Sequence, residues 1–345
     1  MELTMKSKLN VFIVVSVLSF SFSVHAETKL KCRSYSGDTA YLINASMGYD
    51  HDRYGTGPID KRFQFAGFIA SFDSGDDDNK DGKKDFRAVP EWVAYEMKRY
   101  SPDGSSYPMP RPSPARPSPW YEMQALKFLA KQAGVSSARI DKSYAGYGTK
   151  VGPVALEKRP INRGHLAMKS HIQRVSWKAA CNTHVFVNAV PQQADMNQGD
   201  WLALEAYSGA AANQFERIWI LAGPVWKNGK PLGWMKNKGT IPVAVPAGLF
   251  KIIIKENTGK LPDVLAFIFE QPKAGYVKCQ QARKLNHKYN LSQYLTSIND
   301  IEKRTGLEFL RNVNFKNTAQ RKVFKNTKAK VLWPVDDNRY TVTCG

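Results

Sequence analysis

Long apolar runs are nearly absent from this sequence of 345 residues. After residue 26, apolar segments such as Phe250–Ile254 and Val264–Phe269 have only the length of a strand. A helix needs about 20 apolar residues to cross a bilayer, so neither segment predicts a membrane span. We therefore expect no stable membrane insertion of the folded protein.

The one longer apolar stretch lies at the amino terminus. Val11–Val24 follows the basic residues Lys6 and Lys8. It ends in Val24-His25-Ala26, where small residues suit cleavage by a signal peptidase. This order is typical of a cleaved secretory signal. A membrane anchor is the weaker alternative, because the stretch is too short to span a bilayer. We predict that residues 1–26 are removed on export and that 27–345 form a single secreted or periplasmic domain.

Cysteine is also scarce. The sequence has only four: Cys32, Cys181, Cys279 and Cys344. Their wide spacing differs from the close cysteine pairs of structural zinc sites. An even number of cysteines in an exported chain is typical of disulfides, and four of them allow three pairings that the sequence leaves open. We expect two structural disulfide bridges.

Acidic residues are outnumbered, with 30 Asp and Glu against 50 Lys and Arg and a formal net charge of +20. This excess favours an anionic partner, which means nucleic acid, a lipid surface or an acidic polysaccharide. Hydrophobic residues at 43% and aromatic residues at 12% exclude a disordered chain. The charge alone does not choose among the three partners.

Segments with strand and helix patterns follow one another without a regular alternation. We predict strands at 90–98, 184–190, 217–221, 250–255 and 264–270, and helices at 121–133, 196–207 and 291–305. Seven prolines between residues 101 and 119 predict a connecting loop. The order favours an α+β fold, in which helices pack on an antiparallel or mixed β-sheet, over a doubly wound parallel sheet.

His165 lies two residues after Arg163 in a turn-prone setting. An imidazole can accept a proton from water near neutral pH, and a neighbouring guanidinium can bind a phosphate. Taken alone, a single histidine is more often a structural residue than a catalytic base. The residues that follow in the sequence make the catalytic interpretation of His165 the favoured one.

A second group of polar residues lies around the start of a predicted helix. Asn197 is placed where this helix should begin, and its amide oxygen is a hard, neutral ligand suited to magnesium. Trp201 and Leu204 follow at the spacing of a buried stripe. Glu205 lies about 12 Å along the axis from Asn197, at 1.5 Å per residue. It is therefore better placed to hold metal-bound water than to share the metal directly.

Together these residues form an ordered set of motifs. The set is Asn162-Arg163-Gly164-His165, Asn188-Ala189-Val190-Pro191-Gln192, Asn197 and Trp201-Leu202-Ala203-Leu204-Glu205. It resembles the signature of the DNA/RNA non-specific endonucleases of the ββα-metal (His-Me finger) class: Asp-Arg-Gly-His, Asn-x-x-Pro-Gln, Asn and Trp-x-x-Leu-Glu. The resemblance covers roughly residues 60–312 and leaves 313–345 as a basic carboxy-terminal extension.

The resemblance implies a metal-dependent endonuclease with a ββα-metal finger, which hydrolyses the phosphodiester bonds of both DNA and RNA with Mg²⁺, or Mn²⁺ in its place. His165 would be the general base, and Asn197 the sole direct protein ligand of the metal. Arg163 would contact phosphate, Glu205 would order metal-bound waters, and Asn188 would support the site. Because these groups act on the backbone phosphate, base and sugar would matter little.

Two positions depart from the family signature. Asn162 replaces the leading aspartate of the first motif, which keeps hydrogen-bonding capacity but removes a negative charge. Family members often carry arginine one turn after the helix glutamate, where this chain has Gly209. The implied phosphate contact then passes to another basic residue, Arg174 or Lys178, or the activity is reduced.

The sequence also contains residues that could form two other metal sites, one for zinc and one for calcium. His165, His171, Cys181 and His184 could be combined into a zinc set, but such loose spacing arises by chance. The acidic residues Asp77, Asn79, Asp81 and Asp85 match four ligand positions of an EF-hand-like calcium loop. The twelfth position is Ala88 instead of glutamate, so a structural Ca²⁺ site and a solvated acidic turn remain equal alternatives.

The function has alternatives of different classes. A non-catalytic nucleic-acid-binding protein on the same fold is compatible with Asn162 and Gly209. A weaker alternative is an envelope protein that binds lipopolysaccharide or anionic lipid through charge alone. The cations of residues 310–330 are either a solvated face or an extension of a nucleic-acid track: Arg311, Lys316, Arg321, Lys322, Lys325, Lys328 and Lys330. The oligomeric state is not predicted.

Overall fold

The structure is a computed structural model that describes Cys32 and residues 49–73, 87–100, 120–123, 126–127, 131, 139–145, 147, 159–235 and 241–336. Four predictions lie outside these residues: the signal at 1–26, the calcium loop of Asp77, Asn79, Asp81 and Asp85, the proline-rich loop at 101–119, and any pairing of Cys344. Within the described ranges, no helix has the length and apolar character that a membrane crossing needs.

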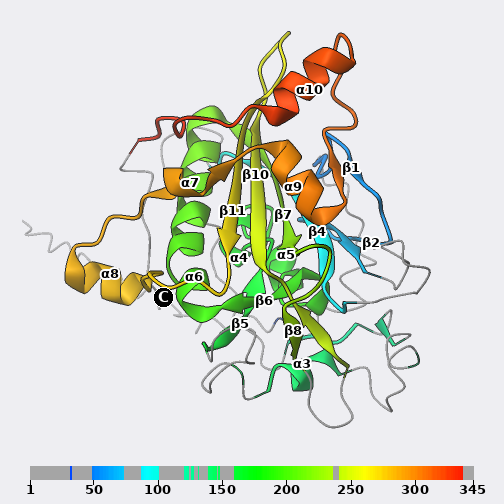
Figure 1. The fold of residues 1–345 in the computed structure, drawn as a ribbon, viewed down its shortest axis with the longest axis vertical. Coiled ribbons are helices and arrows are strands. Elements are labelled where there is room, and N and C mark those ends of the chain that lie inside the picture. Colours follow the sequence, from blue (N-terminus) through cyan, green and yellow to red (C-terminus); the bar gives the residue numbers. More distant parts are fainter. Residues whose placement is uncertain are drawn as a thin grey trace, which may run out of the picture.

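Seven antiparallel strands form the central sheet, in the order β12-β11-β10-β7-β4-β3-β2 (Figure 1). Their bounds are β2 Lys61–Gln64, β3 Ile69–Phe72, β4 Pro90–Lys98, β7 Arg217–Val225, β10 Gly248–Lys255, β11 Asp263–Glu270 and β12 Leu295–Thr296. The longest pairings join β4 to β7, β7 to β10 and β10 to β11. This sheet with helices packed on it confirms the predicted α+β class.

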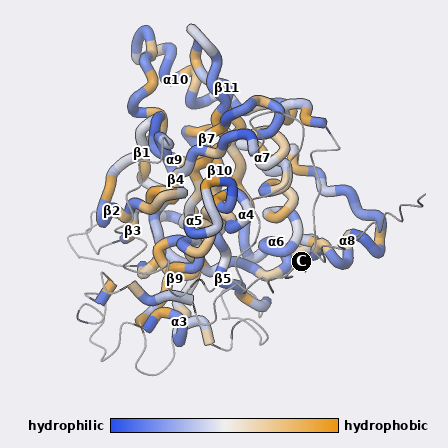
Figure 2. The backbone as a smooth tube through the Cα atoms, turned by 180° about the vertical axis from the view of Figure 1, so that it is seen from behind, coloured by the Kyte–Doolittle hydropathy of each residue, from blue (hydrophilic) through white to orange (hydrophobic). Residues whose placement is uncertain are grey.

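The sheet is buried on both faces. Successive residues of its strands point to opposite sides, and the side chains of each side belong to a hydrophobic core. In β10, Ile253 belongs to the core on one face, and its neighbours Ile252 and Ile254 belong to the core on the other. Trp219 and Ile220 of β7 divide in the same way. Seen from behind, apolar residues are concentrated on the tubes of β7 and β10 (Figure 2). These central strands consist almost wholly of apolar residues for this reason.

Two helices cover the two faces of the sheet. Helix α7 (Asp200–Phe215) supplies Trp201 and Leu204 to one core, and α9 (Ile298–Thr305) supplies Ile298 and Ile301 to the other. The remaining helical elements are α3 Ile140–Ser143, α4 Lys169–Ile172, α5 Trp177–Asn182, η4 Phe186–Asn188, α6 Ala194–Asn197, α8 Cys279–Leu285, η5 Leu291–Tyr294 and α10 Thr318–Asn326. Three small antiparallel sheets join β1 Thr56–Gly57 to β13 Glu308–Phe309, β5 Ile161–His165 to β6 Ala189–Gln193, and β8 Gly233–Met235 to β9 Val243–Val245.

Four of the predicted strands are confirmed. The prediction for 90–98 coincides with β4, and those for 217–221, 250–255 and 264–270 lie within β7, β10 and β11. Helix α9 ends where Gly306 takes a left-handed conformation with φ of 76°, which glycine adopts at little steric cost. Strong apolar runs between clear turn residues were therefore reliable guides.

The strand predicted at 184–190 is wrong, because the strand begins only at Ala189 and runs to Gln193. Before it, the side chain of Asn188 donates to the carbonyl of Thr183, five residues back, over 2.9 Å. This bond closes a turn in which Phe186–Asn188 form the short helix η4. The β-branched residues of this segment are buried in the turn rather than in a strand.

Two predicted helices are only partly right. The helix at 196–207 is two helices, α6 and α7, separated at Gly199, where a Cβ atom would lie 2.1 Å from the carbonyl oxygen of Val277. In the segment 291–305, only Ile298–Thr305 is α-helical, because Ser297 caps it by accepting from the N–H of Asp300. The residues before the cap form η5 and then pair with β11 as β12.

The helix predicted at 121–133 is wrong at its start and otherwise falls largely outside the described residues. Tyr121 forms an isolated bridge with Val185, and its N–H donates to the carbonyl of His184 over 2.9 Å. This pairing holds Tyr121 extended, so no helix begins there.

The basic segment 310–330 includes α10, which lies at the top of the molecule in Figure 1, well above β5 and β6. Several of its cations already have acidic partners. Arg311 and Arg321 pair with Glu308, and Lys325 pairs with Glu302. These pairs and this position favour a solvated face of the fold.

One disulfide joins Cys32 to Cys181, which are 149 residues apart in sequence. It ties the amino-terminal part of the chain to α5, whose last four residues are buried. Cys279 is also disulfide-bonded. The prediction that the cysteines serve as bridges is therefore confirmed for these three.

Removing the first bridge should destabilise the protein strongly. A cross-link that closes so long a loop is worth at most about 5 kcal/mol by chain entropy, and losses of about 2–5 kcal/mol are typical. We expect the variant with Cys32→Ala and Cys181→Ala to lose stability in this range in urea unfolding. Under reducing conditions it should match the reduced wild-type protein. A variant as stable as the oxidised wild type would contradict a stabilising role for the bridge.

Candidate active site

The predicted site residues lie on a β-hairpin and the two helices that follow it. Strands β5 and β6 pair antiparallel, with Ile161 opposite Gln193 and His165 opposite Ala189. The N–H of Ala194, which begins α6, donates to the carbonyl of Pro160 over 2.9 Å. The chain therefore enters α6 at the end of the hairpin that is remote from His165. The arrangement is strand, strand, helix (Figure 1).

Helix α7 then returns toward the His165 end of the hairpin. By Glu205 it has reached the segment just after β5, where the backbone carbonyl of Glu205 accepts from Nε2 of His171 over 2.9 Å. Asn197, at the end of α6, lies on the path between these two points. The hairpin and α7 thus collect His165, Asn197 and Glu205 from 41 residues of sequence into one unit.

His165 and Arg163 project from the same face of β5, because they are two residues apart in a strand. The indole of Trp120 lies against both of them. Its ring centroid is 4.5 Å from that of His165 and 5.5 Å from the Cζ atom of Arg163. His184 meets His165 edge to face, with the centroids 5.0 Å apart. The imidazole is therefore held between two rings, with a cation on the same face.

Neither ring could be assigned to this site from its position in the sequence. Trp120 follows the proline-rich segment, outside every motif, and it is buried with 2% exposure. His184 was considered only as a member of a loose zinc set. A buried tryptophan beside a basic strand carries no local signal, because the contact is made only when distant segments fold together.

The glycine of the first motif has a packing reason. A Cβ atom at Gly164 would lie 2.0 Å from the side-chain oxygen of Gln192 on the paired strand. Any larger residue would push the two strands apart beside His165. Asn162 lies directly opposite Gln192 in the same ladder and is half-buried.

Asn188 is fully buried and bonds to the segment that follows His165. Its side-chain oxygen accepts from the N–H of Ala167 over 2.7 Å, and its amide nitrogen donates to the carbonyls of Ala167 and Thr183, each over 2.9 Å. The backbone N–H of Leu166 in turn donates to the carbonyl of Asn188 over 3.2 Å. These bonds fix the backbone of the segment that follows His165 against Asn188.

Asn197 is half-buried at the end of the short helix α6. Its amide oxygen is a neutral, hard donor of the kind that binds Mg²⁺. Within the described ranges, no group of three or more His, Cys, Asp or Glu side chains converges on a metal position. A single amide ligand fits Mg²⁺ because this ion keeps most of its waters and needs few protein ligands.

Glu205 is buried with 5% exposure, and its Oε1 atom faces the interior of the protein. The indole N–H of Trp201 donates to this oxygen over 3.1 Å, and the Nζ atom of Lys251 lies 3.8 Å from it. Lys251 comes from β10, is 0% exposed, and places its Nζ 4.2 Å from the ring centroid of Trp201. Lys251 is a second contact that the motifs did not reveal.

The protein environment opposes ionisation of this pair. Burial raises the pKa of the Glu205 carboxyl, and the charge of Lys251 and the bond from Trp201 offset only part of the rise. Burial also lowers the pKa of the Lys251 ammonium, against the attraction of Glu205. Each group therefore depends on the other to remain charged.

Comparison with known proteins supports the likeness of the motifs. Residues 39–316 match the DNA/RNA non-specific endonucleases. The chain belongs to this family.

Individual relatives share part of the chain. Human mitochondrial nuclease EXOG is 29% identical over 153 residues, which cover 43% of this chain and 39% of that protein. Human mitochondrial endonuclease G is 29% identical over 158 residues, 44% of this chain and 49% of that protein. The nuclease of Serratia marcescens is 27% identical over 154 residues, 43% and 50% respectively. The chain therefore spans half or less of the length of these relatives.

The structure bears on the missing arginine of the family signature. A Cβ atom at Gly209 would lie 3.2 Å from the Nη2 atom of Arg174, whose guanidinium donates to the carbonyl of Gly209 over 3.0 Å. Arg174 thus places its charge one turn after Glu205, where family members carry their own arginine. Lys178 is exposed, with its Nζ 5.9 Å from the ring centroid of Trp177. Of the two proposed substitutes, Arg174 is bonded to α7.

The alternative zinc set is excluded by the partners of its members. The sulfur of Cys181 is bonded to Cys32 and cannot act as a thiolate ligand. His171 uses both ring nitrogens, since Nε2 donates to the carbonyl of Glu205 and Nδ1 lies 2.9 Å from the hydroxyl of Tyr95. Burial and the charges of Lys251 and Arg174 hold the pKa of His171 well below its usual range, so it is neutral.

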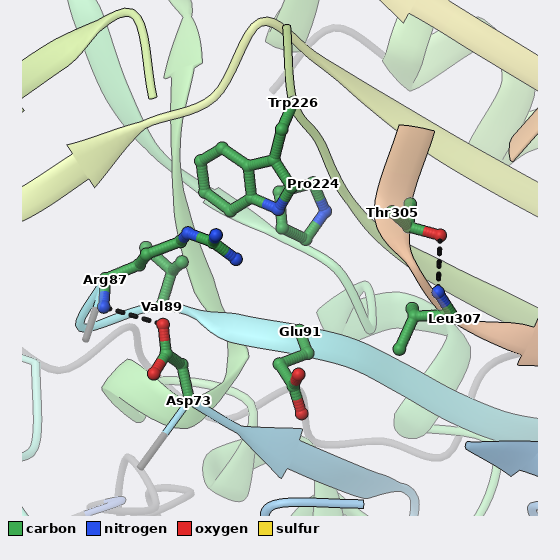
Figure 3. Close-up of a pocket in the computed structure, with 8 residues that line it drawn as sticks. All are labelled: Asp73, Arg87, Val89, Glu91, Pro224, Trp226, Thr305 and Leu307. Atoms are coloured by element: carbon green, nitrogen blue, oxygen red, sulfur yellow. Dashed lines mark hydrogen bonds between the residues drawn. The ribbon is translucent and has the colours of Figure 1, made fainter. Parts of the chain in front are cut away.

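A small hollow elsewhere in the fold has no residue of the motifs (Figure 3). The guanidinium of Arg87 lies over the ring of Trp226, with Cζ 4.5 Å from its centroid, and the backbone N–H of Arg87 donates to Asp73 over 2.6 Å. These contacts hold the end of β3, the start of β4 and the end of β7 close to one another. The hollow is therefore a structural junction rather than part of the site.

Replacing one member of the Glu205–Lys251 pair should cost more than replacing both. Lys251→Met leaves a buried carboxylate without its partner, and we expect a loss of about 3–5 kcal/mol in urea unfolding at pH 8. The loss should be smaller at pH 5, because a carboxyl with a raised pKa in the folded state is protonated there and destabilises only as the pH rises. The double variant Glu205→Gln, Lys251→Met should recover most of the stability. Equal losses in the single and double variants would show that the two groups are not coupled.

The contact of Trp120 with His165 should appear in the rate of DNA cleavage. Trp120→Phe keeps a ring against the imidazole and should stay within a few-fold of the wild-type kcat. Trp120→Ala frees both His165 and Arg163, and a misplacement of about 1 Å can lower kcat by about 10²-fold. The rates are to be measured below the melting temperature of each variant. Equal kcat values for the two variants would contradict a positioning role.

Proposed function

We propose that this protein is a Mg²⁺-dependent endonuclease that hydrolyses the phosphodiester bonds of DNA and RNA without sequence or sugar specificity. The observation that carries this proposal is the unit formed by the β5–β6 hairpin and the helices that follow it. His165 and Arg163 lie on one face of β5, Asn197 ends α6, and Glu205 lies on α7, which returns toward His165. Membership of the endonuclease family supports the reaction class. Residues 27–345 would act as one catalytic domain.

In the proposed reaction, His165 accepts a proton from the water that attacks the phosphorus atom. The rings of Trp120 and His184 hold the imidazole, and Asn188 holds the backbone just after it. The guanidinium of Arg163, on the same face, binds a non-bridging oxygen of the phosphate. As the new P–O bond forms, the bond to the 3′ oxygen breaks and that oxygen takes up a proton from solvent.

Asn197 would hold the metal through its amide oxygen. Bound there, Mg²⁺ would neutralise charge on the phosphate and on the departing oxygen; Mn²⁺ would serve in its place. Glu205 would order waters bound to the metal, and Arg174 donates to the carbonyl of Gly209 one turn later on α7. Because the protein groups address only the phosphate, cleavage would be independent of base identity.

We also propose that residues 1–26 direct export to the periplasm or the medium. Disulfides form and persist in oxidising compartments, and the bond between Cys32 and Cys181 supports such a destination. The excess of positive charge would then serve a protein that meets free nucleic acid outside the cytoplasm.

Purified protein should degrade plasmid DNA and RNA with Mg²⁺ and should be inactive with EDTA. His165→Ala should lower kcat by about 10²–10⁴-fold, the usual contribution of a general base, with an unchanged circular dichroism spectrum. Asn197→Ala should raise the Mg²⁺ concentration needed for half-maximal activity. The matched control is Asn314→Ala, which changes an exposed asparagine of the loop before α10. Full cleavage by His165→Ala would contradict its assignment as the base.

The same assay separates the alternative function. Asn162 in place of the motif aspartate is the observation that favours a protein that binds nucleic acid without cutting it. Such a protein would retain DNA with a strong dependence on salt and would release no fragments at any Mg²⁺ concentration.

A further inference from the structure

The segment 271–289, which contains α8, is bonded directly to the metal-ligand end of the finger. The N–H of Cys279, the first residue of α8, donates to the carbonyl of Gln198 over 2.8 Å. Gln198 is the residue after Asn197. On α6 itself, Asp195 pairs with Lys278, with Nζ and Oδ1 3.4 Å apart. The base of α8 is therefore held within one residue of Asn197.

Further bonds hold the beginning of this segment against the end of β6. Gln193 donates through its side-chain nitrogen to the carbonyl of Lys273 over 2.9 Å, and its side-chain oxygen accepts from the N–H of Lys273 over 3.0 Å. Gln271 accepts from the N–H of Gln193 over 2.8 Å. At Gly199, the absence of a side chain lets the carbonyl of Val277 approach the joint between α6 and α7. The segment is thus fixed against the end of the finger that carries Asn197.

The charge of this segment has one sign only. Between Gln271 and Asn299 the sequence contains no Asp or Glu, whereas it contains five cations: Lys273, Lys278, Arg283, Lys284 and Lys288. Four of these are exposed, and Lys278 is half-buried in its pair with Asp195. Such a cationic face beside a phosphodiester site is suited to the phosphates of a polyanion.

The dimensions of α8 also suit a nucleic-acid backbone. Lys284 lies five residues after the anchored Cys279, which is about 7.5 Å along a helix at 1.5 Å per residue. Successive phosphates of one strand of a duplex advance about 3.4 Å along its axis, so this length corresponds to about two nucleotides. The helix extends away from α6 (Figure 1), with its last residue, Leu285, 71% exposed.

We propose that residues 271–289, here called the α8 platform, bind the phosphates that flank the scissile phosphate of DNA or RNA. The proposal rests on the function proposed above and adds where the substrate strand leaves the site. It assigns the binding track to the α8 platform instead of the basic segment around α10, whose cations lie at the far end of the molecule. The platform would supply affinity and salt dependence without reading bases.

The test compares two variants with the same change of charge. The platform variant carries Lys273→Gln, Lys284→Gln and Lys288→Gln, and the control carries Lys316→Gln, Lys322→Gln and Lys328→Gln near α10. Binding of a 20-base-pair duplex is measured in EDTA at several salt concentrations. Each lost phosphate contact lowers the slope of log K against log salt by about 0.9, so we expect the platform variant to lose about 2–3 from the slope. The control should lose less than about 0.5, since its cations make no contact.

Cleavage kinetics give an independent readout. With plasmid DNA the platform variant should show a KM at least ten-fold higher and a kcat close to that of the wild type. With bis(4-nitrophenyl) phosphate, which is too small to reach α8, all three proteins should act equally. Unchanged slope and KM in the platform variant, or equal losses in the control, would overturn the proposal. If the wild type cuts nothing, the nuclease assignment fails, and the binding slopes still decide whether the platform holds nucleic acid.

Discussion

Lys251 carries a positive charge into the middle of the central sheet, where it is 0% exposed and lies 3.8 Å from Glu205. The pair sets how α7 lies on β10, since Glu205 must face the sheet to meet it, and Trp201 is then stacked beside both. From this helix the rest of the site follows: α6 precedes it, and His171 ties the segment after His165 to its backbone. The buried charges therefore orient the finger.

Around that pair, the site is assembled mainly by amide groups. Asn188 holds the loop after His165, and Gln193 and Gln271 join β6 to the start of the α8 platform. Amide side chains donate and accept at once, so they can close such joints without adding charge. Two carboxylates on these helices, Glu205 and Asp195, each have a lysine nearby. A polyanionic substrate would meet little repulsion there.

Much of the sheet could be predicted because its strands are buried on both faces and consist of apolar runs between turns. Strand β4 and helix α9 show this, the latter through Ser297 and Gly306 at its two ends. The failures occur where a side chain or a distant segment overrides local preference. Asn188 bends the run 184–188 into a turn, the carbonyl of Val277 occupies the space beside Gly199, and pairing with β11 draws Leu295 and Thr296 into a strand.

The chemical groups of this protein can be read from its sequence: an imidazole, a guanidinium, an amide and a carboxylate at fixed spacings, with an excess of positive charge. Spacing suffices for these, because a hairpin and a helix place residues by local geometry. Their surroundings, in contrast, depend on how distant segments fold together. Trp120 beside His165, Lys251 beside Glu205, Arg174 over Gly209 and α8 beside Asn197 come from segments about 35 to 80 residues away along the chain. Such contacts arise from burial and packing, which depend on the whole fold and leave no pattern in a local stretch of sequence.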